Sequence, residues 1–222
     1  MTRSFSSEEI ALNAICPYFT MFPLRFPLAV LQRFANSREI VMDPFCGRGT
    51  TNFAARILGL PTIGIDSSPI AVAATAAKLV HSIRPNDIIS EARNILLGRR
   101  EYHIPRGRFW SLAYRPSVLS AICKLRSALL EDCGSRRRKA LRGILLGALH
   151  GPLRIDGSST YFSNQAPRTY APKPRYAVAF WDRTQFRAPH VDVLEIIGKR
   201  ATRYYGQALP AVEYQVRCED SR

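Results

Sequence analysis

The feature that most constrains the fold of this chain is a strand, a glycine turn and a helix in its N-terminal third. The apolar run EIVM at residues 39–42 leads into Asp43 and the turn DPFCGRGTT. The run TNFAARILGL then repeats apolar residues at helical spacing up to Gly59. The next run, TIGID, predicts a second strand, and SSPIAVAATAAKLVHSI predicts a second helix capped by Ser67 or Ser68. This β-α-β-α unit predicts an α/β fold with a parallel sheet.

The turn and its neighbouring acids predict a nucleotide-like ligand at the ends of these strands. Gly47 and Gly49 would let a ligand approach the backbone closely, and the helix N-terminus after them would present free backbone amides. Asp66 ends the second strand, where an acid in such folds accepts hydrogen bonds from both ribose hydroxyls. Asn52 stands where the dinucleotide fingerprint has its third glycine, which favours a nucleoside without phosphates. In the other interpretation, Asp43 and Asp66 only cap helices.

The middle of the chain departs from this alternation. The second helix is expected to end before Pro85. Residues 117–131 and 138–149 each place apolar side chains on one face, which predicts two amphipathic helices joined around Gly134. Residues 151–187 are rich in Pro, Ser, Tyr and Arg and predict an ordered loop with room for one hairpin.

The C-terminal residues return to a helix and a strand. A helix is predicted to begin after Pro189 and to end near Gly206, and VEYQVRC alternates as a strand that ends at Asp220. We therefore expect three regions: a first β-α-β-α unit with its N-terminal extension, a basic helical and loop insertion, and a third strand, at residues 1–83, 84–205 and 206–222.

The chain carries a large excess of positive charge, with 32 Lys and Arg against 17 Asp and Glu. Between Arg93 and Arg142 there are thirteen basic residues and only three acidic ones. Such a block suits a polyanion because each neutralised phosphate releases counterions, although a solvated basic surface has the same composition. The candidate nucleic-acid contacts are four consecutive bases at the start of a predicted helix or in the loop before it, Arg136, Arg137, Arg138 and Lys139.

Several classes of protein are disfavoured by the sequence. No apolar run approaches the roughly 18 residues that a membrane span needs, and the N-terminus MTRSFSSEEIALNA lacks the pattern of a signal peptide. The five cysteines are widely scattered without a C-x-x-C pair, so no zinc or redox site is predicted. We therefore expect a cytoplasmic protein with no metal site and no membrane partner.

Several sequence motifs of the chain together resemble those of one enzyme family. DPFCGRGTT followed by IGIDSSPIAVAAT resembles the first two cofactor motifs of bacterial DNA methyltransferases that modify exocyclic amino groups of adenine or cytosine, with Arg48 where the family usually has Ser. CPYFTMFPLRFPLAVLQRF resembles the family's N-terminal cofactor motif, and VRCEDSR resembles its third motif. YFSNQAPRTYAPKPRYAVAFW resembles an insert of some of these enzymes. The resemblance implies an incomplete Rossmann-like, class I methyltransferase fold with S-adenosyl-L-methionine as cofactor and DNA as substrate.

The resemblance also implies a role for particular residues. Thr20 and Met21 would contact the methionine end of the cofactor, and Asp43 would face the methionine amino group. Asp66 would hold the ribose, and Asp220 would contact the adenine amino group. The remaining residues would line the turn beneath the cofactor: Phe45, Gly47, Gly49 and Thr50.

One family motif is absent. These enzymes grip the flipped-out base with Asp, Asn or Ser followed by Pro-Pro and an aromatic residue, and this chain contains no Pro-Pro pair. It also lacks the Pro-Cys pair of enzymes that methylate the cytosine ring carbon. We therefore assign no catalytic residue and expect the chain to need a C-terminal segment or a second polypeptide that carries the motif. Two alternatives are an RNA methyltransferase, since some have a similar DPFCG motif, and a non-catalytic nucleic-acid-binding or partner subunit with a vestigial cofactor site.

Overall fold

A computed structural model describes residues 7–16, 21–152, 159–163 and 174–220 of the chain. The described strands are β1 (Val41–Asp43), β2 (Thr62–Asp66) and β3 (Tyr214–Cys218). The described helices, in chain order, are α1 (Ser7–Ala11), the 3-10 helix η1 (Leu12–Ala14), α2 (Arg25–Phe34), α3 (Thr50–Ile57), α4 (Pro69–Leu79), α5 (Pro85–Leu97), α6 (Arg108–Ala113), α7 (Pro116–Glu131), α8 (Arg136–Ala148), α9 (Pro174–Thr184) and α10 (Val193–Tyr205).

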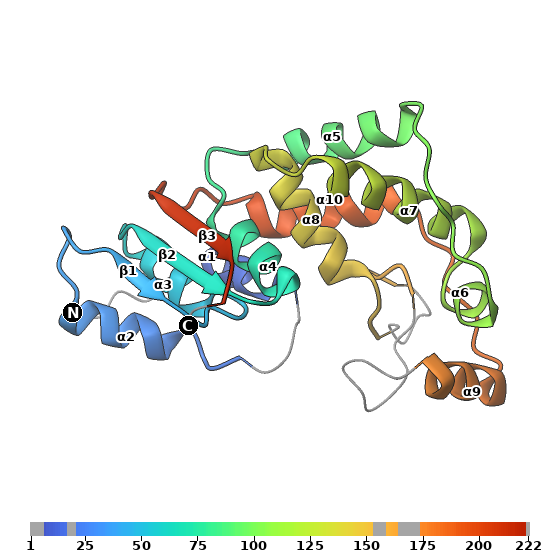
Figure 1. Ribbon diagram of the computed structural model, residues 1–222, viewed down its shortest axis with the longest axis horizontal. Helices are drawn as coiled ribbons and strands as arrows, with labels where there is room; N and C mark the ends of the chain where they lie inside the picture. Colours follow the sequence, from blue (N-terminus) through green and yellow to red (C-terminus); the bar gives the residue numbers. More distant parts are fainter. Residues whose placement is uncertain (1–6, 17–20, 153–158, 164–173, 221–222) are drawn as a thin grey trace.

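The strands form one parallel sheet in the order β1-β2-β3. In its register Asp43 lies opposite Gly64, and Asp66 lies opposite Cys218. Strand β3 joins the sheet only after the long helical region between α4 and α10 (Figure 1). The arrangement confirms the predicted α/β class and the incomplete Rossmann-like sheet.

Helices α3 and α4 cover one face of the sheet and contact each other. Val41, Thr62 and Gly64 are buried toward these helices. On the opposite face Met42 is 56% exposed and Arg217 is exposed, and no described helix covers them. Parallel sheets are normally covered on both faces, so this sheet has an open face as well as an unpaired outer edge on β1 within the described residues.

The helical region from α5 to α10 packs on the outer side of α4. Gly143 and Gly147 allow a close approach, because a Cβ on Gly143 would collide with the Ala77 side chain and one on Gly147 with the Ile15 carbonyl. One continuous hydrophobic cluster runs from α3 through α4 to α5, α7, α8 and α10. The expected insertion therefore shares its core with the first β-α-β-α unit, and α6 and α9 lie at the far end of the long axis from the sheet (Figure 1).

The structure corrects one expectation about helices. Residues 174–184, expected to lie in a loop, form α9, with Ala177 and Trp181 buried one turn apart. Pro85 lies beyond the end of α4, as expected, and it is also the first residue of α5, a position at which proline is favoured because its missing N–H has no partner to lose. The predicted helices at α7, α8 and α10 are confirmed.

None of the helices in the described part of the chain is both long enough and apolar enough to cross a bilayer.

Candidate cofactor site and basic surface

The candidate site is built around the turn that joins β1 to α3. Gly47 and Gly49 have φ values of 50° and 68°, in the left-handed region that glycine adopts without strain. The Cys46 N–H donates to the Ile65 carbonyl at 2.9 Å, and the Gly49 N–H donates to the Cys46 carbonyl at 2.6 Å. The turn is thus closed on itself and held against the end of β2.

Helix α4 packs tightly on this turn. A Cβ on Gly49 would lie 2.6 Å from Thr75 Oγ1, closer than a normal contact. The same hydroxyl donates to the Gly47 carbonyl at 3.1 Å, and Thr75 is fully buried. Position 49 therefore admits only glycine, and a side chain from α4 fixes the turn.

Asp66, the last residue of β2, supplies a half-buried carboxylate. Its Oδ2 accepts from the Gly47 N–H and its Oδ1 accepts from the Ser68 N–H, both at 2.8 Å. Ser68 in turn caps α4 by accepting from the Ala71 N–H at 3.5 Å. Because each carboxylate oxygen has more than one lone pair, Asp66 can hold the turn and still accept hydrogen bonds from a ligand.

Two backbone amides of the turn are used within the protein. The Gly47 N–H donates to Asp66 Oδ2, and the Gly49 N–H donates to the Cys46 carbonyl. The turn thus closes these hydrogen bonds before α3 begins. The two glycines allow the left-handed backbone of the turn and the close contact with α4. Hydrogen-bond acceptors for a ligand are instead supplied by the carboxylates at the ends of the strands.

Three carboxylates lie at one edge of the sheet. Asp43 and Asp66 are the last residues of β1 and β2, and Asp220 follows the last residue of β3 by two positions. The carboxyl ends of parallel strands meet at the same edge, where ligands of α/β sheets bind. Asp43 Oδ1 accepts from the Phe45 N–H at 3.1 Å, and Asp220 is exposed. This edge offers acceptors and negative charge in a chain that is otherwise strongly basic.

The two remaining residues of the turn differ in exposure. The Phe45 side chain is 75% exposed, so its ring is accessible beside the carboxylate edge. Thr50, the first residue of α3, is buried and acts mainly by starting the helix beneath the turn.

The N-terminal segment is tied to α4 by a polar chain. Met21 Sδ accepts from Asn13 Nδ2 at 3.5 Å, and Asn13 Oδ1 accepts from Lys78 Nζ at 2.8 Å. Thr20 lies outside the described residues. The Asn13–Lys78 pair was not predicted, although a lysine inside the apolar run AATAAKLV indicates a buried amine that needs a partner.

Lys78 is fully buried beneath the turn. Burial, with a smaller effect of the Arg48 guanidinium, lowers the pKa of Lys78 to about 7. Burial raises the pKa of the Cys46 thiol to about 11 and also raises the pKa of the Cys16 thiol. The amine can therefore change its charge near neutral pH, whereas the two thiols stay protonated there.

Asn52 is a second residue whose role the sequence did not reveal. Its buried Nδ2 donates to Thr62 Oγ1 at 2.8 Å and to the Ile63 carbonyl at 3.0 Å, which joins α3 to β2. In the sequence it stood out only as the replacement for a third glycine.

Two of the four candidate nucleic-acid contacts are paired with acids. Arg138 Nε lies 2.7 Å from Glu91 Oε1, and its Nη1 lies 2.9 Å from Asp132 Oδ2. Arg137 Nη2 lies 4.0 Å from Asp87 Oδ1. Much of the charge at these two positions is thus balanced within the protein.

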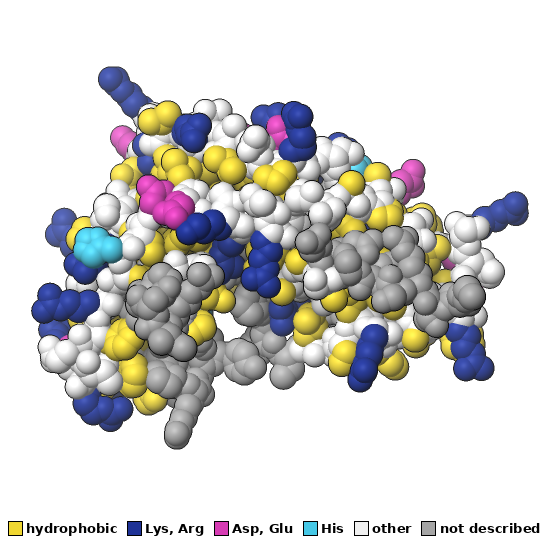
Figure 2. Space-filling model, turned by 180° about the vertical axis from the view of Figure 1, so that it is seen from behind, with side chains coloured by type: hydrophobic (Ala, Val, Ile, Leu, Met, Phe, Trp, Pro, Cys, Tyr) yellow, Lys and Arg dark blue, Asp and Glu magenta, His cyan; other side chains and the backbone are white. Residues whose placement is uncertain are grey.

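The basic cluster at the start of α8 does not lie beside the carboxylate edge. Lys139 Nζ lies 5.9 Å from the ring centroid of Tyr214, and Tyr214 opens β3 opposite Thr62, the first residue of β2. The cluster, including the exposed Arg136, therefore lies toward the N-terminal ends of the strands (Figure 1). Figure 2 shows basic side chains spread over the whole of the face it presents, with few acidic ones among them.

Comparison with known proteins gives an assignment for the N-terminal third of the chain. Residues 4–77 match a family model described as DNA methylase. No curated protein and no solved structure matches the chain. The matched residues include the glycine turn, Asp43 and Asp66, and they stop before Asp220 and the helical region. The chain is thus similar to the DNA methylase family over residues 4–77.

Proposed function

We propose that the chain is the S-adenosyl-L-methionine-binding portion of a DNA methyltransferase that methylates an exocyclic amino group of adenine or cytosine. The observation that carries this proposal is the set of three carboxylates around a glycine turn. S-adenosyl-L-methionine presents a sulfonium, an ammonium and one carboxylate on its methionine part, two ribose hydroxyls and an adenine amino group, and it has no phosphate. Its cations and donors suit carboxylates, which would repel a pyrophosphate.

The residues at this edge fit the cofactor in chemistry. Asp66 would accept from the ribose hydroxyls with the lone pairs that the turn leaves over, and Asp220 would accept from the adenine amino group. Asp43 Oδ2, which has no hydrogen-bond or ion-pair partner among the described residues, would face the methionine ammonium. The other proposed contacts are Thr20, Met21, Phe45, Gly47, Gly49 and Thr50.

The protein would contribute to the reaction mainly by positioning the cofactor relative to the target amine. The cofactor supplies a methyl group on a good leaving group, so the chain has to hold it at a fixed distance and angle from the target amine. The turn is suited to this task because Thr75, Asp66 and the Ile65 carbonyl each fix it by a hydrogen bond.

We further propose that the catalytic motif lies on another segment that pairs with β1. The outer edge of β1 is unpaired in the described structure, and Ile40 and Met42 beside it are 61% and 56% exposed. A strand added there would complete the sheet next to Asp43 and would place a Pro-Pro-aromatic loop at the carboxylate edge.

Methyl transfer to DNA tests the whole proposal. The purified chain is assayed with labelled S-adenosyl-L-methionine and duplex DNA, alone and co-expressed with a family segment that carries the Pro-Pro-aromatic motif. We expect transfer only in the second case, with N6-methyladenine or N4-methylcytosine as the product. Transfer to RNA in preference to DNA would identify an RNA methyltransferase, and robust transfer by the chain alone would disprove the need for a second segment.

Asp66→Ala tests the cofactor site. Loss of the carboxylate leaves ribose hydroxyls without acceptors and should weaken binding by about 1 to 3 kcal/mol. Calorimetry of the reconstituted enzyme measures the Kd, and Glu219→Gln removes an unassigned exposed charge from the same edge as a control. We expect the control to keep the parent Kd. If Asp66→Ala, still folded by circular dichroism, also keeps it, Asp66 is not a cofactor contact.

A further inference from the structure

A cleft lies between α6 and the C-terminal end of α9. We propose that this cleft binds one strand of DNA outside the target nucleotide, holding a phosphate and the base next to it. The inference rests on the proposed DNA substrate, but it concerns a surface remote from the carboxylate edge, at the opposite end of the long axis (Figure 1).

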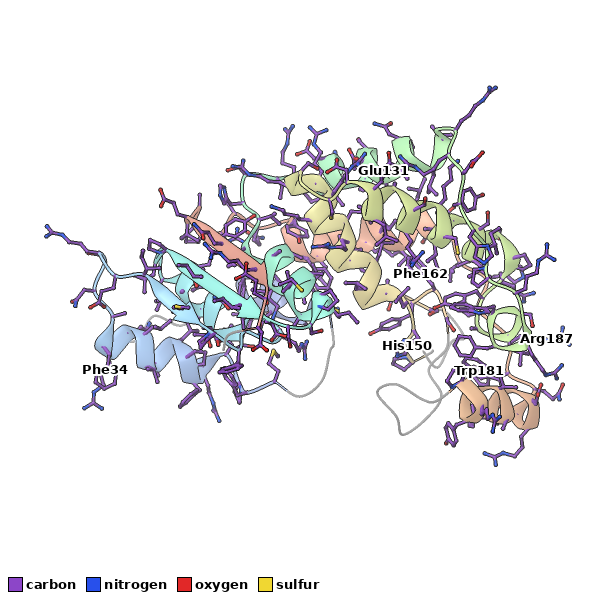
Figure 3. The ribbon with its side chains drawn as sticks, in the orientation of Figure 1. Phe34, Glu131, His150, Phe162, Trp181 and Arg187 are labelled. Atoms are coloured by element: carbon purple, nitrogen blue, oxygen red, sulfur yellow. The ribbon has the colours of Figure 1, made fainter. Side chains whose placement is uncertain are left out.

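The cleft has the size and lining of a nucleotide site. Its volume is about 380 Å³, and its walls combine guanidinium groups with aromatic rings. Trp181 of α9 and Arg187 of the segment after it are labelled in Figure 3. The residues that matter for binding are Arg108, Arg115, Arg187, Tyr114, Trp181 and Phe186.

Two of the arginines are held in place and still have donors to spare. Arg108 makes a two-point contact with Asp182, from Nη2 to Oδ1 at 2.6 Å and from Nε to Oδ2 at 3.1 Å. Arg115 Nε donates to the Ala188 carbonyl at 3.0 Å. A guanidinium has five N–H donors, so each retains several for a phosphate. With the exposed Arg187, three cations face one carboxylate, and the cleft is positively charged.

Trp181 provides a donor that nothing in the described structure satisfies. Its side chain is only 5% exposed, and its Nε1 has no hydrogen-bond acceptor among the described residues. A buried N–H without an acceptor is costly. The ring itself is packed against Phe109, at 5.7 Å between centroids, and Trp181 lines the cleft, so a base that entered the cleft would meet an ordered aromatic wall.

These features favour a nucleic-acid strand over other anions. Guanidinium groups match phosphate oxygens, and aromatic and guanidinium surfaces stack on bases. The cleft also differs from the cluster at Arg136–Lys139, where acids of the protein already pair with Arg137 and Arg138.

DNA binding without cofactor tests the cleft independently of methyl transfer. The full chain is titrated against a fluorescein-labelled duplex, the single strand of the same sequence and the corresponding RNA, over a range of salt. The cleft variant is R108Q with R187Q, and the matched control is R33Q with R38Q, which removes the same charge from two exposed arginines in and just after α2. Trp181→Phe keeps an aromatic ring but removes the N–H and one of the two fused rings of the indole. Circular dichroism checks that each variant is folded.

We expect the cleft variant to raise the Kd for DNA about tenfold and to flatten the slope of log Kd against log salt by about one to two. Trp181→Phe should raise the Kd about threefold to fivefold without a change of slope, and the control should change the Kd less than twofold. Equal effects of the cleft and control variants, or an unchanged Kd for Trp181→Phe, would overturn the proposal, as would tighter binding of the RNA. If these tests fail while methyl transfer to DNA succeeds, only the cleft is disproved.

Discussion

At the scale of single residues, the turn beneath the carboxylate edge depends on Gly49 for two separate reasons. Its φ is positive, and a Cβ there would press on Thr75. Gly59 also has a positive φ, of 76°, but nothing lies within 4 Å of its Cβ position. An alanine at position 59 would therefore test backbone strain alone, whereas an alanine at position 49 would add a steric clash.

Gly49→Ala should destabilise the fold much more than Gly59→Ala. We expect Gly59→Ala to cost about 1 kcal/mol, the strain of a left-handed L-residue. Gly49→Ala should cost about 3 kcal/mol or more, because α4 must also move away from the turn. Urea unfolding of both variants measures the difference. Equal losses would show that α4 does not press on the turn.

Lys78 should make stability depend on pH. Its pKa of about 7 in the fold is lower than the 10.5 of an unburied lysine, so between these values the unfolded chain binds the proton more strongly. Stability should therefore rise as pH increases from about 7 toward 10, as far as this residue is concerned. Thermal unfolding at several pH values compares the parent with Lys78→Met. Both proteins contain the buried thiols, so the difference between their stabilities at each pH reports Lys78 alone. If stability changes with pH equally in both proteins between pH 7 and 9, the pKa of Lys78 is not lowered in the fold.

At the scale of elements, the close contact of α8 with α4 and η1 depends on glycine. We expect Gly147→Ala to destabilise by about 2 kcal/mol or more, since its Cβ would collide with the Ile15 backbone. Gly198→Ala in α10 is the control, because its Cβ would lie 3.6 Å from Ile89 Cδ1, an ordinary contact. It should stabilise by about 0.5 to 1 kcal/mol through helix propensity. Urea unfolding should give opposite signs for the two variants, and the same sign would refute the close approach of α8.

The elements show why sequence reasoning succeeded in some places and failed in others. The strands β1 and β2 and the turn between them were predictable because apolar runs, glycines and acids occur in one local order. Helix α9 was hidden because the composition around Pro174 is typical of a loop, and only Ala177 and Trp181 face inward. The Asn13–Lys78 contact could not be predicted in the same way, since it joins residues 65 positions apart.

At the scale of the whole molecule, charge and apolar surface are arranged differently. Basic side chains are spread over the face seen in Figure 2, whereas three carboxylates, those of Asp43, Asp66 and Asp220, lie at the carboxyl ends of the strands. Several exposed apolar side chains lie in β1 and in α2, close to the unpaired edge of the sheet. Four of them are spaced by four residues in and just before α2: Phe22, Phe26, Val30 and Phe34.

This row, which we call the α2 stripe, should cause the isolated chain to self-associate. Phe26 and Phe34 are 60% and 68% exposed, and a contiguous apolar surface next to an unpaired strand edge favours association. Phe26→Glu with Phe34→Glu should shift the chain toward monomer in sedimentation velocity, because two charges would be buried in any contact made by the stripe. The control, Leu97→Glu with Leu130→Glu, changes two side chains that are 78% and 68% exposed on α5 and α7, far from the sheet edge. We expect the control to associate like the parent.

If both pairs reduce association equally, general surface hydrophobicity is the cause, and if the α2 pair has no effect, the stripe is not the contact surface. Loss of methyl transfer by the α2 pair in the co-expressed enzyme would then show that the same stripe receives the segment that completes the sheet.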